Sequence, residues 1–313
     1  MTALRRNILK DAPARDAYIQ GLKLLKAEML DEPLSTYDFF VIWHHQAMMI
    51  PTPVTQGRRN AAHVGPVFLP WHRFFLIVLE QQLQRVLDNP DFGLPYWAWH
   101  VDGDKTPDEQ KASAIWGPDC MGGAGTPVDT GPFAFDQSNP ASWRVRVQPT
   151  IASGLLTVDR GLRRESGADP RFAALPTSAE VTDAMSYPVY DEPEWLDKSQ
   201  TTFRNVLEGW GATSPRLHNL VHVWVGGDMG PSTSPNDPVF FLNHCNVDRV
   251  WAAWQQKNPT SPYLPDAAAA ADLSGHRVDD RLWAPFPDAP TVRDMLNVSS
   301  IYTYDSFTDI PGV

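Results

Sequence analysis

The amino-acid sequence predicts a mainly α-helical protein with long ordered loops and short strands around its helices. Segments near both ends of the chain repeat apolar residues at helical spacing. Between residues 101 and 200 the composition turns to Gly, Pro, Ser and Asp, yet tryptophan and phenylalanine are scattered through it, which favours ordered loops over a linker. With 29 prolines and 42% apolar residues, we expect one domain over residues 1–313, with rigid loops.

The helices are predicted in chain order from their apolar patterns. The first ends its apolar face at Met29, the second follows Ser35, a favoured N-cap residue, and the third opens at Pro70, which suits a first turn. The fourth predicted helix contains a pair of histidines, and the fifth begins within the run "NDPVFFLNHCNVDRVW". Five segments have a helical pattern: residues 14–30, 36–49, 70–87, 201–225 and 238–257.

Charge and composition exclude several classes of protein. A net charge of −11 argues against nucleic acid or an anionic membrane as partner, and the chain has no run of about 18 apolar residues that could span a bilayer. The start lacks the apolar core of a signal peptide, which favours a cytoplasmic location and leaves export with a partner protein open. Two cysteines, Cys120 and Cys245, exclude a disulfide framework or a thiolate-rich zinc site.

Histidines set this sequence apart chemically. In "LHNLVHVWVGG" two of them lie one helical turn apart among apolar residues, where burial is costly unless a partner satisfies them. Other predicted helices also carry histidines, and helix bundles build metal sites from inward-facing side chains of this kind. Imidazoles without carboxylate or thiolate favour copper or zinc. Two groups of three are the simplest partition: His44, His63 and His72, then His218, His222 and His244.

Two alternatives stand beside the metal interpretation. A single buried histidine is usually a hydrogen-bonded core residue, so the prediction depends on the pair and on its repetition across helices. A zinc hydrolase would normally recruit a carboxylate ligand or a catalytic glutamate, as in His-Glu-x-x-His. Here Asn219 follows His218, which disfavours the hydrolase.

Three segments together resemble the two copper-binding regions of the tyrosinase family, the type-3 copper proteins. They are "AHVGPVFLPWHRFFL", "LHNLVHVWVGGDM" and "SPNDPVFFLNHCNVDRVWAAW". Shorter matches extend the resemblance nearly end to end, among them "YDFFVIWH", "LPYWAW", "FRNVLEGW" and "YTYD". The resemblance implies a mainly helical domain whose central four-helix bundle holds a dinuclear copper site that binds dioxygen. Because the sequence ends eight residues after Asp305 of "YTYD", the motif that closes the family's catalytic core, no C-terminal shielding domain is expected.

The resemblance also implies roles for individual histidines. His44, His63 and His72 correspond to the ligands of the first copper, and His218, His222 and His244 to those of the second. His45 is the competing neighbour of His44, but the family motif selects His44. His100 and His276 have no place in the motif and are expected to be structural or exposed.

Further residues are expected around the two coppers. Asn236 and Asp248 are candidates to hold the second ring nitrogen of a ligand histidine, and Phe240 is expected to pack over the dicopper pocket. In family members that hydroxylate monophenols, residues matching Glu208 and Asn219 are thought to hold a water that deprotonates the phenol. Glu208 lies ten residues before His218, slightly further than in related bacterial proteins.

The resemblance therefore implies an enzyme with two copper ions that uses dioxygen to oxidise small phenolic substrates. We expect o-diphenols or o-aminophenols to give quinones or quinone imines, with ortho-hydroxylation of monophenols as an additional activity. A dedicated catechol or o-aminophenol oxidase is the main alternative, and reversible oxygen carriage is less favoured. A small partner protein that delivers copper or shields the site would fit the same scheme.

Overall fold

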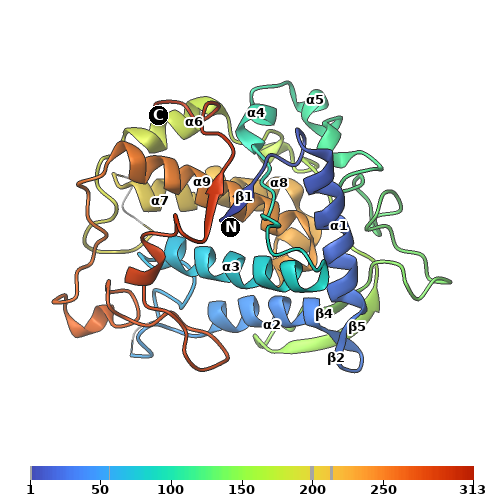
Figure 1. Ribbon diagram of the computed structural model, residues 1–313, viewed down its shortest axis with the longest axis horizontal. Helices are drawn as coiled ribbons and strands as arrows, with labels where there is room; N and C mark the ends of the chain where they lie inside the picture. The colour runs from blue at the N-terminus through green and yellow to red at the C-terminus, as the bar shows by residue number, and fades with distance from the viewer. Residues whose placement is uncertain (1, 56, 198–200, 212–213) are drawn as a thin grey trace.

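The computed structural model describes residues 2–55, 57–197, 201–211 and 214–313. Its centre is a bundle of four helices (Figure 1): α2 (Thr36–Met49), α3 (Phe68–Val86), α8 (Leu217–Val225) and α9 (Val239–Lys257). Helix α1 (Ala12–Ala27) packs across α2 and α3. The predicted mainly helical fold with a central four-helix bundle is confirmed.

Helix α2 begins and ends where the sequence predicts. The Ser35 hydroxyl accepts from the N–H of Asp38, while the Asp38 carboxylate accepts from the N–H of Ser35, so two otherwise unpaired donors are satisfied. Helix α3 begins two residues earlier than predicted, at Phe68, and keeps Pro70 in its first turn. Aromatic rings pack between these two helices, and the centroid of the Trp43 ring lies 5.7 Å from that of the Trp71 ring.

The first predicted helix is too long at its end. Helix α1 ends at Ala27, and Met29 lies 45% exposed in β2 (Met29–Asp31), which pairs with β3 (Leu34–Ser35). The chain reverses direction here before α2, and the main-chain carbonyl of Glu28 accepts the N–H of Thr36 at 2.8 Å across the turn.

The predicted segment 201–225 divides into two helices. Helix α7 (Phe203–Glu208) ends at Gly209, whose φ of 102° lies in the left-handed region. A Cβ at Gly209 would meet the carbonyl oxygen of Arg216 at 2.0 Å, so the turn into α8 requires glycine. Residues 212 and 213 of this predicted segment lie outside the described residues.

The middle of the chain consists of ordered loops and short elements, as predicted. Three short helices were not anticipated: α4 (Trp99–Gly103), α5 (Pro107–Lys111) and α6 (Ser178–Ser186). The strands β4 (Val145–Pro149) and β5 (Leu155–Arg160) form an antiparallel hairpin below α2 (Figure 1). In the described ranges, six 3₁₀ segments connect the larger elements: Ala114–Trp116, Pro170–Phe172, Gly227–Met229, Ser234–Asn236, Ala271–Leu273 and Arg293–Met295.

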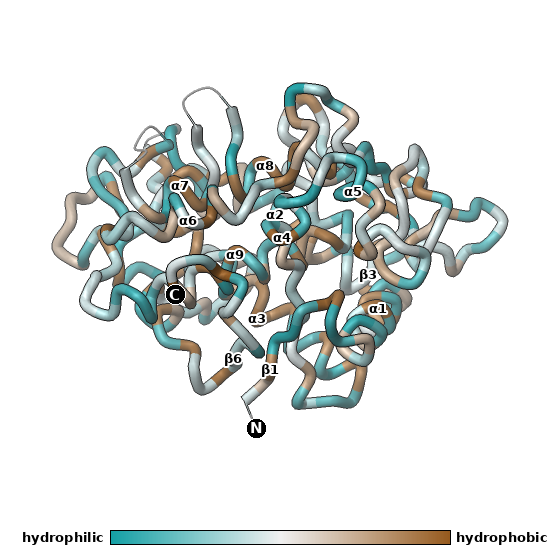
Figure 2. Tube along the Cα trace, turned by 90° about the horizontal axis from the view of Figure 1, so that it is seen from above, coloured by the Kyte–Doolittle hydropathy of each residue, from teal (hydrophilic) through white to brown (hydrophobic). Residues whose placement is uncertain are grey.

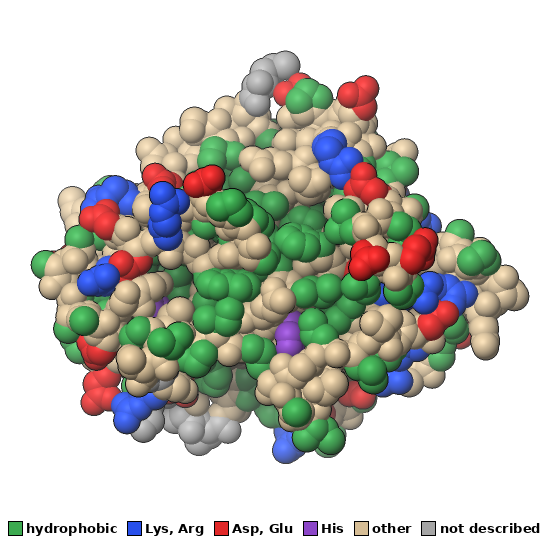
Figure 3. Space-filling view, turned by 90° about the horizontal axis from the view of Figure 1, so that it is seen from below, with side chains coloured by type: hydrophobic (Ala, Val, Ile, Leu, Met, Phe, Trp, Pro, Cys, Tyr) green, Lys and Arg blue, Asp and Glu red, His purple; other side chains and the backbone are tan. Residues whose placement is uncertain are grey.

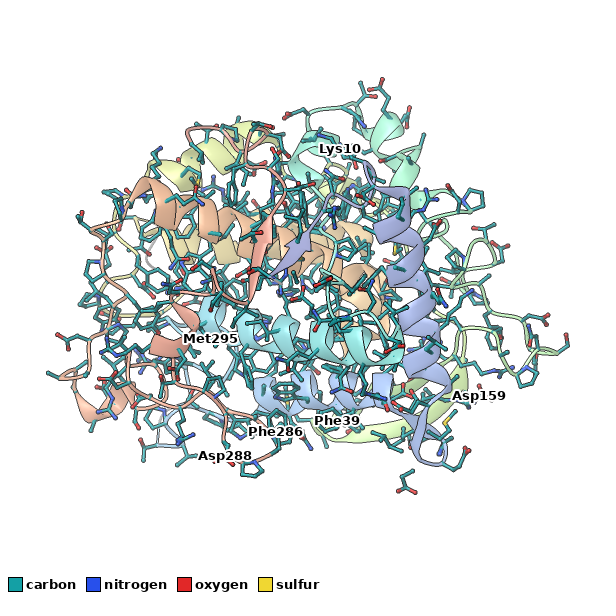
Figure 4. All side chains as sticks on the ribbon, in the orientation of Figure 1. Lys10, Phe39, Asp159, Phe286, Asp288 and Met295 are labelled. Atoms are coloured by element: carbon teal, nitrogen blue, oxygen red, sulfur yellow. The ribbon has the colours of Figure 1, made fainter. Side chains whose placement is uncertain are left out.

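The two ends of the chain meet on one side of the bundle. Strand β1 (Ala3–Arg5) pairs in parallel with β6 (Tyr302–Tyr304), and Figure 2 shows them side by side. The segment before β6 covers α2 and α3. There the ring of Phe286, labelled in Figure 4, lies 5.2 Å from that of Trp43. Among the described residues, no helix is long and apolar enough to cross a membrane.

Candidate metal centre

The first group of histidines joins α2, α3 and the loop between them. His44 lies on α2, His72 in the first turns of α3 and His63 in the loop, and one ring nitrogen from each lies within 4.8 Å of the others. All three side chains are buried. The loop is fixed where it carries His63, because the Asn60 side chain accepts the N–H of His63 at 2.7 Å.

The second group joins α8 and α9. His218 and His222 lie one turn apart on α8, and Nε2 of His244, from α9, lies 3.1 Å and 3.3 Å from their Nε2 atoms. His218 and His244 are buried, whereas His222 is partly exposed. Three ring nitrogens therefore converge on one small space.

The two groups face each other across the bundle. The rings of His72 and His244 stack with centroids 4.2 Å apart. The Phe240 ring packs against both groups, 4.1 Å from the His244 ring and 4.9 Å from the His44 ring. The Phe240 ring thus contacts both groups, and its packing over a dicopper pocket stays a prediction.

Main-chain carbonyls set the orientation of four of these rings. Nδ1 of His44 donates to Ser232 O at 2.7 Å and Nδ1 of His222 donates to Met229 O at 2.8 Å. A carbonyl only accepts hydrogen bonds, so Nδ1 carries the proton and Nε2 keeps its lone pair. The same pattern holds for the other two rings, through Phe68 O for His72 and Glu208 O for His218.

Burial keeps these imidazoles neutral. It lowers the pKa of His44 to about 3 and that of His222 to about 4. Burial and the neighbouring histidines also hold the pKa well below the ordinary value at four positions: His63, His72, His218 and His244. Metal binding needs neutral imidazole, so the ligands are in the right state at neutral pH.

The arrangement fits a pair of copper ions. Nε2 of His44 and of His72 are buried without a hydrogen-bond partner, an expensive state that a metal would relieve. Neutral imidazoles without carboxylate or thiolate are a donor set that copper favours. In the described part of the chain, these two histidine groups are the clusters able to hold a metal ion.

Two expected partners of the histidines lie elsewhere. The Asp248 carboxylate accepts from Arg5, Arg73 and the hydroxyls of Tyr302 and Tyr304, which surround it. The Asn236 amide donates to Val147 O in β4 at 2.7 Å. The assignment of Asn236 and Asp248 to a ligand histidine is therefore corrected: carbonyl groups hold four of the rings, and Nδ1 of His244 has no hydrogen-bond partner.

Glu208 and Asn219 both lie against His218. The Asn219 side-chain oxygen is 3.0 Å from Nδ1 of His218, which also faces the Glu208 carbonyl. The Glu208 carboxylate is fully buried and accepts from Val64 N at 2.7 Å and from Arg204 at 2.8 Å. Burial raises the pKa of Glu208, and Arg204 opposes that rise.

The remaining histidines have structural partners. His45 lies beside His44 but outside the first group, bonded to Ser232 Oγ and Ser153 O. His100 is buried with Nε2 3.0 Å from Asp309 O, and His276 is buried with Nε2 2.8 Å from the Thr52 hydroxyl. Both were expected to be structural or exposed, and both are buried.

Sequence reasoning missed the carbonyl partners of the rings and the bridging residue Ser232. A carbonyl is present in every residue, so no side-chain pattern could have indicated which ones face the histidines. Only the fold of the segment between α8 and α9 brings Met229 and Ser232 to the two groups.

Comparison with known proteins supports the same interpretation. Residues 34–257 match the family model described as the common central domain of tyrosinase. A tyrosinase from Streptomyces lincolnensis is 38% identical over 283 residues, covering 89% of this chain and 92% of that protein. Grixazone synthase from Streptomyces griseus is 36% identical over 292 residues, covering 86% and 90%. These similarities confirm the resemblance predicted from the sequence.

A solved structure shows the same fold. A mutant polyphenol oxidase from Thermothelomyces thermophila superposes with a TM-score of 0.70 at 24% identity, covering 97% of this chain and 88% of that one. The helical bundle and its surrounding loops are therefore shared with a protein of low sequence identity.

Proposed function

The chain belongs to the tyrosinase family, and from this premise we propose that it oxidises o-diphenols or o-aminophenols and also hydroxylates monophenols. As a member of this family it is a dicopper phenol oxidase, and its two histidine groups form a dinuclear type-3 copper site. The copper pair, when bound, supplies the exchange of two electrons between the phenolic substrate and dioxygen. The fit of the six neutral imidazoles to this cofactor is the observation that carries the proposal.

The proposed reactions balance with dioxygen as the only co-reactant. Two o-diphenols and one dioxygen give two o-quinones and two waters. One monophenol and one dioxygen give one o-quinone and one water, with one oxygen atom inserted beside the hydroxyl. An o-aminophenol gives a quinone imine in the same way as a diphenol.

Monophenol hydroxylation needs a base that the chain itself must provide. Free phenol has a pKa of about 10, so at neutral pH only on the order of one molecule in a thousand is ionised. The main-chain carbonyl of Glu208 and the side-chain oxygen of Asn219 both face Nδ1 of His218, so the two residues lie beside the same ring. A water between them could accept the phenolic proton, which supports their assignment as the residues that serve this step.

This assignment predicts a selective loss of hydroxylation. Glu208→Gln and Asn219→Ala should each lower the hydroxylation of tyrosine about tenfold or more, and the oxidation of catechol much less, because catechol ionises more readily and general-base catalysis contributes roughly 10²-fold or more. Turnover of tyrosine and of catechol should be measured on the same copper-loaded samples. Asn297→Ala, a change at an exposed residue, serves as the control.

The alternative function, a dedicated catechol or o-aminophenol oxidase, makes a different prediction. Such an enzyme with two bound coppers would oxidise catechol or 2-aminophenol and leave tyrosine and simpler monophenols unchanged. Equal losses on tyrosine and catechol in both variants would contradict the specific role of Glu208 and Asn219.

A small partner protein that delivers copper or shields the site is part of the same proposal. The first histidine group is buried, so copper must reach it through the folded chain or during folding. Full loading of the purified, folded chain from copper in solution would contradict a need for delivery.

A further inference from the structure

The β4–β5 hairpin is tied to the segment between α8 and α9 at both its base and its middle. At the base, Arg160 of β5 makes two hydrogen bonds to the Asp228 carboxylate, at 2.7 Å and 2.6 Å. Such a paired contact fixes direction as well as distance. In the middle, the buried amide of Asn236 donates to Val147 O of β4 at 2.7 Å.

The tip of the hairpin is held by His45. Nε2 of His45 lies 3.1 Å from Ser153 O, and Nδ1 lies 2.7 Å from the Ser232 hydroxyl. Since the carbonyl only accepts, Nε2 carries the proton and donates to Ser153, and Nδ1 accepts from Ser232. His45 therefore links the tip of the hairpin to the same segment that holds its base.

That segment orients both histidine groups. Ser232 uses its hydroxyl for His45 and its carbonyl for Nδ1 of His44, at 2.7 Å. Three residues earlier, Met229 O accepts from Nδ1 of His222 at 2.8 Å. His45 and Ser232 thus connect the hairpin tip to His44, and Asp228, which holds the hairpin base, directly precedes Met229, which holds His222.

The hairpin presents apolar side chains to solvent beside this arrangement. Ile151 at the tip is fully exposed and Leu156 is 50% exposed. Figure 3 views the side on which α2 and the hairpin lie, and apolar side chains gather there around a visible histidine. Asp159, labelled in Figure 4, lies at the other end of β5, where Arg144 and Arg146 neutralise it.

We infer that the β4–β5 hairpin forms one wall of the phenol-binding site and that His45 is the positioning residue that holds this wall against the histidine groups. The inference rests on the proposed function and names the part of the chain that contacts the ring substituent of the phenol. An apolar substituent next to Ile151 gains contact with the hairpin tip, whereas unsubstituted catechol does not reach it.

Two pairs of substitutions, at His45 and at Ser232, separate the two ends of the His45 link. The amide of His45→Asn lies where Nδ1 lies, so it keeps a partner for Ser232 and loses Ser153. His45→Gln reaches the position of Nε2 and keeps the donor to Ser153. Ser232→Ala removes the hydroxyl and retains the carbonyl that holds His44, while Ser232→Thr restores a hydroxyl. His100→Asn, a change at a buried histidine bonded to Asp309 O, is the matched control.

The first measurement is hydrogen–deuterium exchange at residues 150–154 of the copper-free protein. His45→Asn should speed exchange at the tip relative to the wild-type chain and His100→Asn, because the tip loses its anchor. His45→Gln should stay close to wild type. Unchanged exchange in His45→Asn would overturn the inference, whatever the enzyme oxidises.

The second measurement is the KM for 4-tert-butylcatechol divided by that for catechol, with copper content determined on the same samples. His45→Asn and Ile151→Ser should raise this ratio about fivefold, the effect of losing roughly one contact or hydrogen bond, with kcat for catechol kept and two coppers bound. Ser232→Ala should raise it and Ser232→Thr should restore it. An unchanged ratio in all three, with copper bound, would contradict the wall. Absence of any catechol oxidation in the wild-type chain would contradict the proposed function while leaving the exchange result to decide the role of His45.

Discussion

At the residue scale, four of the six histidines in the two groups are oriented by uncharged main-chain groups. A carbonyl fixes the proton on Nδ1 and so exposes Nε2, without adding a negative charge beside the metal. A carboxylate in the same place would make the imidazole more basic and would place a further charge in the buried bundle. The carbonyls of Ser232 and Met229 therefore give one geometry to His44 and His222 at low electrostatic cost.

His44 and His45 provide the sharpest test at this scale. Neighbouring residues on a helix point about 100° apart, so only one of them can face the first metal. His44→Ala should reduce bound copper from two ions per chain to one, whereas His45→Ala should retain both. Metal analysis after dialysis of each variant measures this. Loss of copper in His45→Ala with full retention in His44→Ala would reverse the assignment.

The sequence indicated the candidate ligands because histidine is chemically specific and its spacing is visible. The structure brings those six side chains into two groups. The partners of the ligands could not be predicted in the same way. Asp248 lies one helical turn after His244, but its carboxylate is occupied by Arg73 and the hydroxyls of Tyr302 and Tyr304. The partners that occupy it come from α3 and β6, which no local pattern indicates.

At the scale of elements, one carboxylate joins the two ends of the chain to the bundle. Asp248 on α9 accepts from Arg73 on α3 at 2.5 Å and from Tyr302 and Tyr304 of β6, each at 2.5 Å. Burial alone would raise the pKa of Asp248, but Arg73 and Arg5 hold it below its ordinary value. This network fixes the distance between α3 and α9, which carry His72 and His244.

Breaking this network should destabilise the whole fold. Asp248→Asn removes the buried counter-charge of Arg73 and leaves Arg5 with Glu80 alone, and the loss of one partner of a buried pair costs about 3–5 kcal/mol. Asp279→Asn removes an exposed partner of Arg293 and should change the free energy of unfolding by less than about 1 kcal/mol. Urea unfolding of both variants tests this, and equal stabilities would contradict the structural role of Asp248.

The sequence predicted the long helices better than their connections. Helix α2 was bounded correctly because its cap is encoded locally by Ser35 and Asp38. The break between α7 and α8 was missed, since Gly209 interrupts an otherwise helical pattern and its requirement comes from the close approach of Arg216. The way the hairpin docks was also beyond prediction, because its anchors lie about 70 to 110 residues away in the chain.

At the scale of the whole molecule, the buried histidines link stability to pH. Burial lowers the pKa of His44 and of His276 to about 3, whereas in an unfolded chain each titrates near pH 6.5, at about the unperturbed value. Between these values the unfolded chain binds more protons than the folded one. Lowering the pH therefore favours unfolding, by about 1.4 kcal/mol per pH unit for each such group.

The copper-free protein should accordingly lose stability steeply between pH 6.5 and 5, before most carboxylates titrate. The denaturant midpoint measured at several pH values across that range tests the effect. Replacing His276 by Gln, which retains a partner for Thr52, should make the slope shallower. A midpoint that stays constant from pH 7 to 5 would show that these histidines are not buried in their neutral form.

The central claim is that two copper ions bound by the two histidine groups carry out phenol oxidation. The most direct measurement is copper content together with catechol oxidation in the wild-type chain and in His222→Ala. We predict two coppers and rapid dioxygen-dependent oxidation in the wild type, and at most one copper with essentially no oxidation in the variant, because one copper cannot supply two electrons to dioxygen. Full activity in His222→Ala, or zinc as the only tightly bound metal in an active wild-type enzyme, would contradict the claim.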